Sequence, residues 1–73
     1  MDDLSRQPVR DELTQRERDI LRLITEGLSN QEVSERLFIT LGTVKWYLKQ
    51  VYSKLGVSSR TQAIVQAQKL NLV

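Results

Sequence analysis

A helix-initiating pattern occurs twice in the first half of this chain, and it restricts the fold more than any other feature. The TQRE stretch at residues 14–17 and the SNQE stretch at residues 29–32 each place a hydroxyl three positions before a glutamate. In such a capping box the hydroxyl accepts from the third helical amide, and the carboxylate accepts from the amide of the capping residue. Thr40 and Ser59 are further candidate caps. The sequence therefore predicts four helices, beginning after residues 14, 29, 40 and 59.

Apolar residues recur at helical spacing after each cap, which predicts one buried face per helix. The expected core residues are Ile20, Leu21, Leu23, Ile24, Val33, Leu37, Val44, Leu48, Val51, Leu55, Ala63, Ile64, Ala67 and Leu70. Gly27 and Gly56 are placed to end the first and third helices. With 73 residues, no strand pattern and no repeat, the chain predicts an all-α, four-helix bundle-like domain. We expect a flexible arm or linker at residues 1–12 and the domain at residues 13–73.

The second and third predicted helices are joined by residues 38–40 alone. A short helix, a tight turn and a longer helix form a helix-turn-helix, whose second helix enters the DNA major groove. Phe38 and Ile39 in the turn are both apolar. We therefore expect the turn itself to help close the core.

The composition excludes the commonest kinds of catalytic and metal-binding site. The chain has no cysteine and no histidine, so it lacks thiolate ligands, disulfides and the commonest general base. No paired carboxylates, phosphate-cradling glycine loop or nucleophile constellation is present, so we expect neither an enzyme, a cofactor nor a small-molecule ligand. No apolar run approaches the roughly 20 residues of a membrane span. A cytoplasmic protein associated with the nucleoid is expected, with no membrane partner.

The charges are divided along the chain. Residues 1–35 hold five arginines against nine carboxylates, a net charge of −4, whereas residues 36–73 hold six basic residues and no carboxylate. Such asymmetry indicates a polyanionic partner, although chance segregation is the simpler alternative.

The third predicted helix, at about residues 41–55, carries an outward tryptophan. At 100° per residue Trp46 lies about 200° from Val44, almost opposite the core stripe. Lys45 flanks that face, which is shared by Gly42, Lys49, Gln50 and Ser53, and the helix contains no acid. Duplex DNA would cover such a face, with lysines on phosphates and Trp46, Lys49 and Gln50 at base edges. The alternatives are a protein partner anchored by Trp46, or packing of Trp46 on the N-terminal arm.

Five motifs occur together between residues 13 and about 67: LTxRE, GLSNxEV, TVK, KLGV and RTxA. In this combination and spacing the chain resembles the LuxR-type (GerE/FixJ-like) helix-turn-helix domain of bacterial transcription regulators. The stretch LGTVKWYLKQVYSKLGV is most similar to the DNA-binding end of large MalT-like activators. Tyr47 stands where the family usually has histidine, and there we expect a change in packing.

The resemblance implies the output domain of a transcription regulator, such as a response regulator, with its third helix in the major groove. The base-reading positions of the family correspond to Lys45, Trp46 and Lys49, to which the exposed face adds Gln50. The positions that contact the DNA backbone correspond to Ser29, Asn30, Thr43 and Lys54. Tyr52, at the flank of the same helix, is interpreted as partly buried core.

Domains of this type often dimerise through the last helix. We expect a weak homodimer through a mildly apolar stripe formed by Thr61, Val65, Gln68 and Leu72. RNA polymerase is a possible further partner. Region 4 of a sigma factor shares part of the motif pattern and remains an alternative, but the amphipathic fourth helix argues against it.

Glu17 falls inside the apolar arc of the first helix, where a carboxylate needs a partner. We predict an ion pair between Glu17 and Arg60, the residue that opens the fourth helix. The alternative is that Glu17 serves only its capping box.

Overall fold

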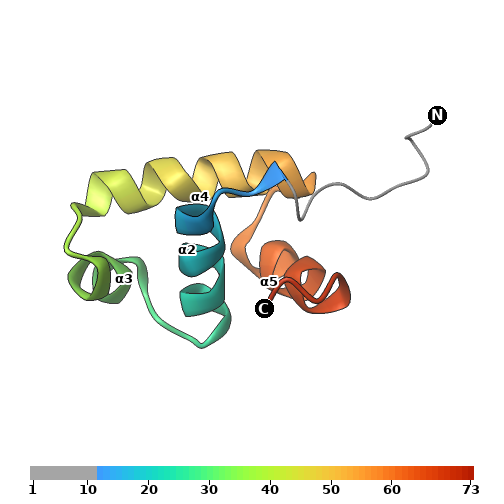
Figure 1. Cartoon of the computed structure of the whole chain (residues 1–73), viewed down its shortest axis with the longest axis horizontal. Helices are drawn as coiled ribbons and strands as arrows, with labels where there is room; N and C mark the ends of the chain where they lie inside the picture. Colours follow the sequence, from blue (N-terminus) through green and yellow to red (C-terminus); the bar gives the residue numbers. More distant parts are fainter. Residues whose placement is uncertain (1–11) are drawn as a thin grey trace.

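The computed structural model describes residues 12–73, so the arm predicted at residues 1–12 lies almost entirely outside the described residues. Within the described part the chain forms four helices and no strand, which confirms the all-α prediction (Figure 1). They are α2 (Gln15–Thr25), α3 (Asn30–Leu37), α4 (Leu41–Leu55) and α5 (Arg60–Lys69).

All four helices begin where the sequence predicts. At α2 the Thr14 hydroxyl accepts from the Glu17 amide at 3.1 Å, and the Glu17 carboxylate accepts from the Thr14 amide at 2.8 Å. The same pair of bonds, with the same lengths, joins Ser29 and Glu32 at α3. Single hydroxyl caps open α4 at Thr40 and α5 at Ser59. These caps satisfy amides that a helix start would otherwise leave unpaired.

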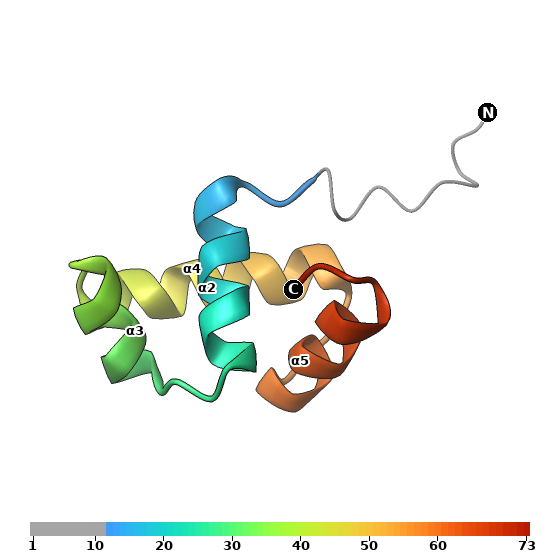
Figure 2. The ribbon, with the colours of Figure 1, turned by 60° about the horizontal axis from the view of Figure 1, so that its bottom comes forward.

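The longest helix, α4, is the axis around which the others are arranged. α2 runs across it, α3 lies beside its first turns and α5 lies near its last turns (Figures 1 and 2). The buried core draws on all four helices and on Leu13, which precedes α2: Leu13, Ile20, Leu21, Leu23, Ile24, Val33, Val44, Leu48, Val51, Leu55, Ala63 and Ala67. Leu37 and Ile64 pack against this cluster while partly exposed. The predicted core is thereby confirmed except at Leu70, which is only half-buried and closes α5 as its C-cap.

The turn between α3 and α4 closes the core with one of its apolar residues and not with the other. Ile39 packs against the core, but the Phe38 side chain is 93% exposed, so the expectation for Phe38 is wrong. Phe38 ends α3 in the left-handed conformation, with φ 59°. This backbone turn brings the Ile39 amide onto the Ser34 carbonyl at 3.1 Å, and it turns the ring of Phe38 into solvent.

The end of the chain also differs from the prediction. α5 stops at Lys69, and Leu72 lies beyond it, partly buried against the core. The Leu72 amide donates to the Ala67 carbonyl at 2.8 Å, which folds the last residues back along the helix. Leu72 is therefore not part of an outward stripe on α5, because that stripe assumed a helix continuing past Lys69.

Candidate nucleic-acid interface

The outer face of α4 is basic and open. Lys45, Trp46 and Lys49 are exposed, Gln50 is half-buried, and no acidic residue occurs in the helix. Trp46 keeps 56% of its surface accessible, as the helical spacing predicts. Its ring meets Tyr47 edge to face, with centroids 5.1 Å apart and planes at 74°. Tyr47 packs in turn against the core, so Trp46 is supported on one side and available on the other.

A shallow depression joins this face to the start of α3. It has a volume of about 360 Å³ and is lined by Asn30, Lys45, Leu48, Lys49 and Tyr52. Three predicted DNA contacts from two different helices thus meet on one surface. Tyr52 packs against the core, as interpreted from the sequence, but it also lines this depression. The sequence interpretation missed this second position. Its spacing from Lys45 and Lys49, by seven and three positions, was the available signal.

Ser29 and Thr43 each use the hydroxyl in a local contact. The Ser29 oxygen accepts from the Glu32 amide, which leaves its own hydrogen available as a donor. The Thr43 and Thr40 hydroxyl oxygens lie 2.9 Å apart. Ser29 is the N-cap of α3, and Thr43 lies in the first turn of α4. At such helix starts the backbone amides and the positive end of the helix dipole favour an anion.

Lys54 has two partners inside the domain. Its ammonium donates to the Glu17 carboxylate at 2.8 Å and to the Glu12 carbonyl at 2.9 Å. Glu17 is buried, and its predicted pairing with Arg60 is wrong: the ion pair joins α2 to the end of α4 instead. The Lys54 ammonium has three hydrogens, and only one of them remains for a further acceptor. Lys54 is therefore less free to contact phosphate than the family resemblance implies.

The environment of Glu17 keeps it ionised. Burial alone raises the pKa of Glu17, but hydrogen bonds from Lys54 and the Thr14 amide, with the Lys54 charge, outweigh burial. The pKa of Glu17 therefore lies below its ordinary value.

Arg60 reaches the start of α3. One guanidinium nitrogen donates to the Asn30 side-chain oxygen at 2.8 Å, and another donates to the Leu28 carbonyl. Sequence reasoning missed these contacts, because Arg60 and Asn30 are 30 residues apart and no local pattern pairs an arginine with an asparagine.

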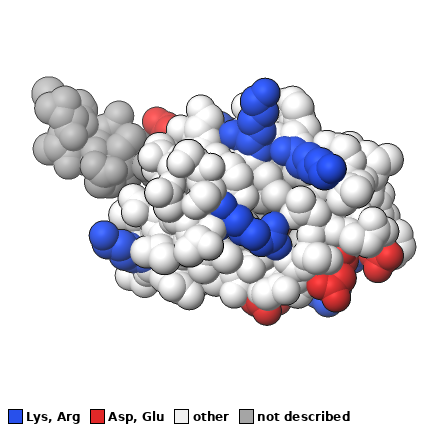
Figure 3. All heavy atoms as spheres, turned by 180° about the vertical axis from the view of Figure 1, so that it is seen from behind, with Lys and Arg blue, Asp and Glu red and all other residues white. Residues whose placement is uncertain are grey.

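The acidic residues gather away from the α4 face. A larger hollow, of about 650 Å³, is lined by Glu26, Glu32 and Glu35 together with Gly27, Leu28, Arg36 and Phe38. Figure 3 shows basic side chains over the upper and central part of one face and most of its acidic ones at the lower edge. Carboxylates there repel phosphate, so the two sides of α3 differ in the ligand that they can accept.

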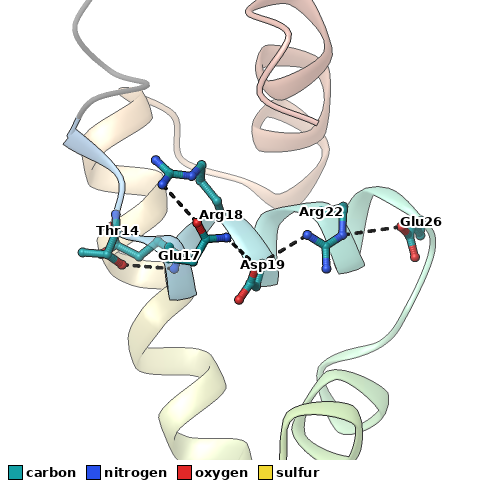
Figure 4. Close-up of polar contacts among 7 residues, drawn as sticks. Thr14, Glu17, Arg18, Asp19, Arg22 and Glu26 are labelled. Atoms are coloured by element: carbon teal, nitrogen blue, oxygen red, sulfur yellow. Dashed lines mark hydrogen bonds and ion pairs between the residues drawn. The ribbon is translucent and has the colours of Figure 1, made fainter.

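The exposed side of α2 carries a chain of ion pairs. Arg22 lies 3.5 Å from Asp19 and 3.8 Å from Glu26 (Figure 4). Arg18 donates to the Leu13 carbonyl. Such exposed pairs contribute little to stability. The charged side chains of this helix face therefore pair with one another.

The predicted dimer face keeps three of its four residues. Thr61, Val65 and Gln68 are exposed on α5, with 48% of Val65 accessible. Thr61 and Val65 line a depression of about 370 Å³ that also includes Gly56, Val57, Gln62 and Gln66.

Other kinds of site find no support in residues 12–73. No group of three or more carboxylates there could hold a metal ion. No helix in this part is long and apolar enough to cross a membrane.

A short helix, a tight turn and a longer basic helix with an open outer face define a helix-turn-helix domain. The family model described as bacterial regulatory proteins, luxR family, matches residues 11–67. The chain belongs to this family.

Two of the relatives are named as regulators. The chain is 54% identical over 61 residues to the transcriptional regulatory protein LiaR of Bacillus subtilis, and 48% identical over 61 residues to the response regulator VraR of Staphylococcus aureus. Each match covers 84% of this chain and 29% of the relative. The chain therefore spans less than a third of the length of either protein.

Two solved structures share the fold. The response regulator ChrA of a haem-sensing two-component system superposes with a TM-score of 0.82 at 44% identity, over 93% of this chain and 32% of ChrA. The transcription factor GerE superposes with a TM-score of 0.77 at 38% identity, over 82% of this chain and 90% of GerE. The match therefore covers most of the GerE chain but less than a third of the length of the ChrA chain or of LiaR and VraR.

Proposed function

We propose that this domain binds operator DNA sequence-specifically, with α4 in the major groove, and serves as the DNA-binding output domain of a bacterial transcription regulator. The observation that carries the proposal is the acid-free outer face of α4, where Lys45 and Lys49 share a depression with Asn30. Lys45, Trp46, Lys49 and Gln50 read base edges. Lysine pairs well with guanine O6 and N7, and the Trp46 ring offers an apolar surface to a thymine methyl group.

Contacts to the DNA backbone come from the start of α3 and both ends of α4. Ser29, Asn30 and Thr43 bind phosphate oxygens through hydroxyl, amide and backbone donors. Lys54 uses its remaining ammonium hydrogen for a phosphate while it holds Glu17. Its contribution to affinity is accordingly smaller than that of Lys49.

We infer the parts of the full protein that lie outside this domain from its relatives. The names of VraR and ChrA associate such domains with response regulators, so we place a sensory or receiver part elsewhere in the full protein. A MalT-like activator is the other arrangement, to which the sequence of α4 points. In either case the domain works without catalysis or cofactor, in the cytoplasm at the nucleoid, as a weak dimer and with RNA polymerase as a further partner.

Binding isotherms at several salt concentrations test the proposal, with an operator duplex selected from random DNA and a scrambled duplex. Lys49→Ala is expected to weaken operator binding more than scrambled binding, because a bidentate base contact gives about 1–3 kcal/mol of discrimination. Trp46→Ala should do the same and leave thermal stability nearly unchanged, because the ring faces outward. Arg22→Ala, on the ion-paired face of α2, is the matched control. It should change neither the affinity for the operator nor the affinity for the scrambled duplex.

Three results would contradict the assignment. Equal losses on both duplexes with Lys49→Ala would restrict Lys49 to the DNA backbone. Unfolding of Trp46→Ala would make Trp46 a core residue. Affinity nearly independent of salt would favour a protein partner anchored by Trp46, because phosphate contacts make DNA binding fall steeply with salt.

A further inference from the structure

Arg60 and Asn30 form a contact between α5 and α3 on the margin of the DNA-binding depression. The guanidinium donates to the Asn30 oxygen at 2.8 Å and, through a second nitrogen, to the Leu28 carbonyl. Asn30 is the first residue of α3 and lines the depression beside Lys45 and Lys49. Arg60 does not line that depression.

The contact determines which end of the Asn30 amide faces outward. An asparagine amide has an oxygen that only accepts and a nitrogen that only donates. Because the oxygen accepts from Arg60, the NH₂ group lies at the opposite edge of the planar amide, turned away from Arg60. Phosphate oxygens only accept, so a phosphate binds the NH₂ group and is repelled by the oxygen.

The second nitrogen of Arg60 acts on the same helix start. Leu28 directly precedes the cap Ser29, and a hydrogen bond on the Leu28 carbonyl fixes the backbone that leads into α3. A planar guanidinium can hold both acceptors at once, whereas an ammonium offers a point charge without that geometry.

We propose that Arg60 is a positioning residue for DNA binding: from α5 it orients the Asn30 amide so that its NH₂ group donates to a backbone phosphate. This inference rests on the proposed function, since it presumes that the depression meets DNA. Arg60 itself does not contact DNA.

A double-mutant cycle on operator affinity tests the inference, using Arg60→Met, Asn30→Ala and the double variant. Each single change is expected to weaken binding by roughly 3- to 10-fold, the size of one hydrogen bond. The double variant should bind no more weakly than the weaker single variant, because both changes remove the same contact. Lys69→Met, which removes a positive charge at the other end of α5, is the control for net charge and should leave affinity nearly unchanged.

The salt dependence separates positioning from direct contact. Arg60→Met should leave the slope of log affinity against log salt unchanged, whereas Lys54→Ala, which removes a proposed phosphate contact, should reduce it by about one unit. A reduced slope with Arg60→Met would show a direct phosphate contact and overturn the inference. Additive losses in the cycle, or unchanged affinity with Arg60→Met, would overturn it as well.

Thermal unfolding of each variant shows whether a loss of affinity results from a loss of folding. If Arg60→Met does not fold, Arg60→Lys takes its place in the cycle, with the same expectations for coupling and slope. Failure of the proposed function is distinguishable, because the unsubstituted domain would then fail to prefer its operator or to respond to salt.

Discussion

At the scale of single residues, Glu17 shows how one side chain can serve two structural purposes. Its carboxylate closes the capping box of α2 and also binds the Lys54 ammonium from α4. A buried carboxylate is costly unless it is paired and hydrogen-bonded, and Glu17 satisfies both conditions. The pair joins the start of α2 to the end of α4, the helix proposed to bind DNA.

Glu17→Gln isolates the charge, because the glutamine oxygen can still accept from the Thr14 amide. We expect the free energy of unfolding at neutral pH to fall by about 1.5–3 kcal/mol, the usual worth of a hydrogen bond to a charged group. Chemical denaturation measures this. Glu35→Gln, at an exposed position in α3, is the control and should change stability by less than about 0.5 kcal/mol.

The pH dependence follows from the lowered pKa of Glu17. A carboxylate whose folded pKa is depressed stabilises the fold fully above its unfolded pKa, here near the ordinary value of 4.5. That contribution is lost as the pH falls through the lower folded pKa. The stability difference between the unsubstituted domain and Glu17→Gln should therefore shrink as the pH falls below 4.5. A difference that stays constant down to pH of about 2 would contradict the ion-pair account.

At the scale of the elements, α4 has one glycine inside its first turn, Gly42, and another directly after its last residue, the C-cap Gly56. Gly56 has φ 72°, and a Cβ atom added there would meet no atom within 4 Å. Glycine is therefore favoured at this position by the backbone conformation and not by lack of space. Gly42 has ordinary helical geometry, and a Cβ there would lie 3.9 Å from the Thr40 hydroxyl oxygen, an ordinary contact. Two alanine substitutions in one helix should consequently act in opposite directions.

Gly56→Ala should destabilise the domain by about 1–2 kcal/mol, the cost of a left-handed residue with a side chain. Gly42→Ala should stabilise it by about 0.5–1 kcal/mol, because alanine has the higher helix propensity. Thermal unfolding of both variants checks the pair. Operator affinity of Gly42→Ala then distinguishes a glycine needed for close approach to DNA, where affinity falls, from a neutral one.

At the scale of the whole molecule, the surfaces proposed for DNA binding and for dimerisation lie on different helices. α4 and the start of α3 form the surface proposed for DNA, and α5 carries the exposed residues proposed for dimerisation. Arg60, at the start of α5, contacts Asn30 in the first of these surfaces. The proposed dimer helix and the proposed DNA surface are thus joined by a direct hydrogen bond.

Val65→Glu tests the dimer face. The exposed apolar area is small, so the free domain should be mostly monomeric at micromolar concentration and dimerise on DNA with two half-sites. Val65→Glu should reduce the gain in affinity from a second half-site by about tenfold, an effect of about 1.4 kcal/mol. Isotherms on duplexes with one and two half-sites measure that gain, with Gln15→Glu in α2 as the charge control. An unchanged gain would place the interface elsewhere.

The sequence by itself determined the helices and the outward face of α4. A hydroxyl cap and its partner amide lie three residues apart, and a helix face repeats every three to four residues, so both are local properties. The all-α fold, the four helix starts and the exposure of Trp46 could therefore be read from residue spacing. The LuxR-type motifs were recognisable for the same reason, because they occupy fixed positions in these elements.

Only the tertiary structure decided which charged and polar groups meet. Glu17 lies 37 residues before Lys54, and the crossing of α2 over α4 placed Lys54, rather than Arg60, beside it. Arg60 was thereby left to bind Asn30 and Leu28. The same holds at Phe38 and Leu72, whose exposure depends on how the chain leaves a helix. Such pairings depend on the relative placement of helices, which residue spacing within one helix does not encode.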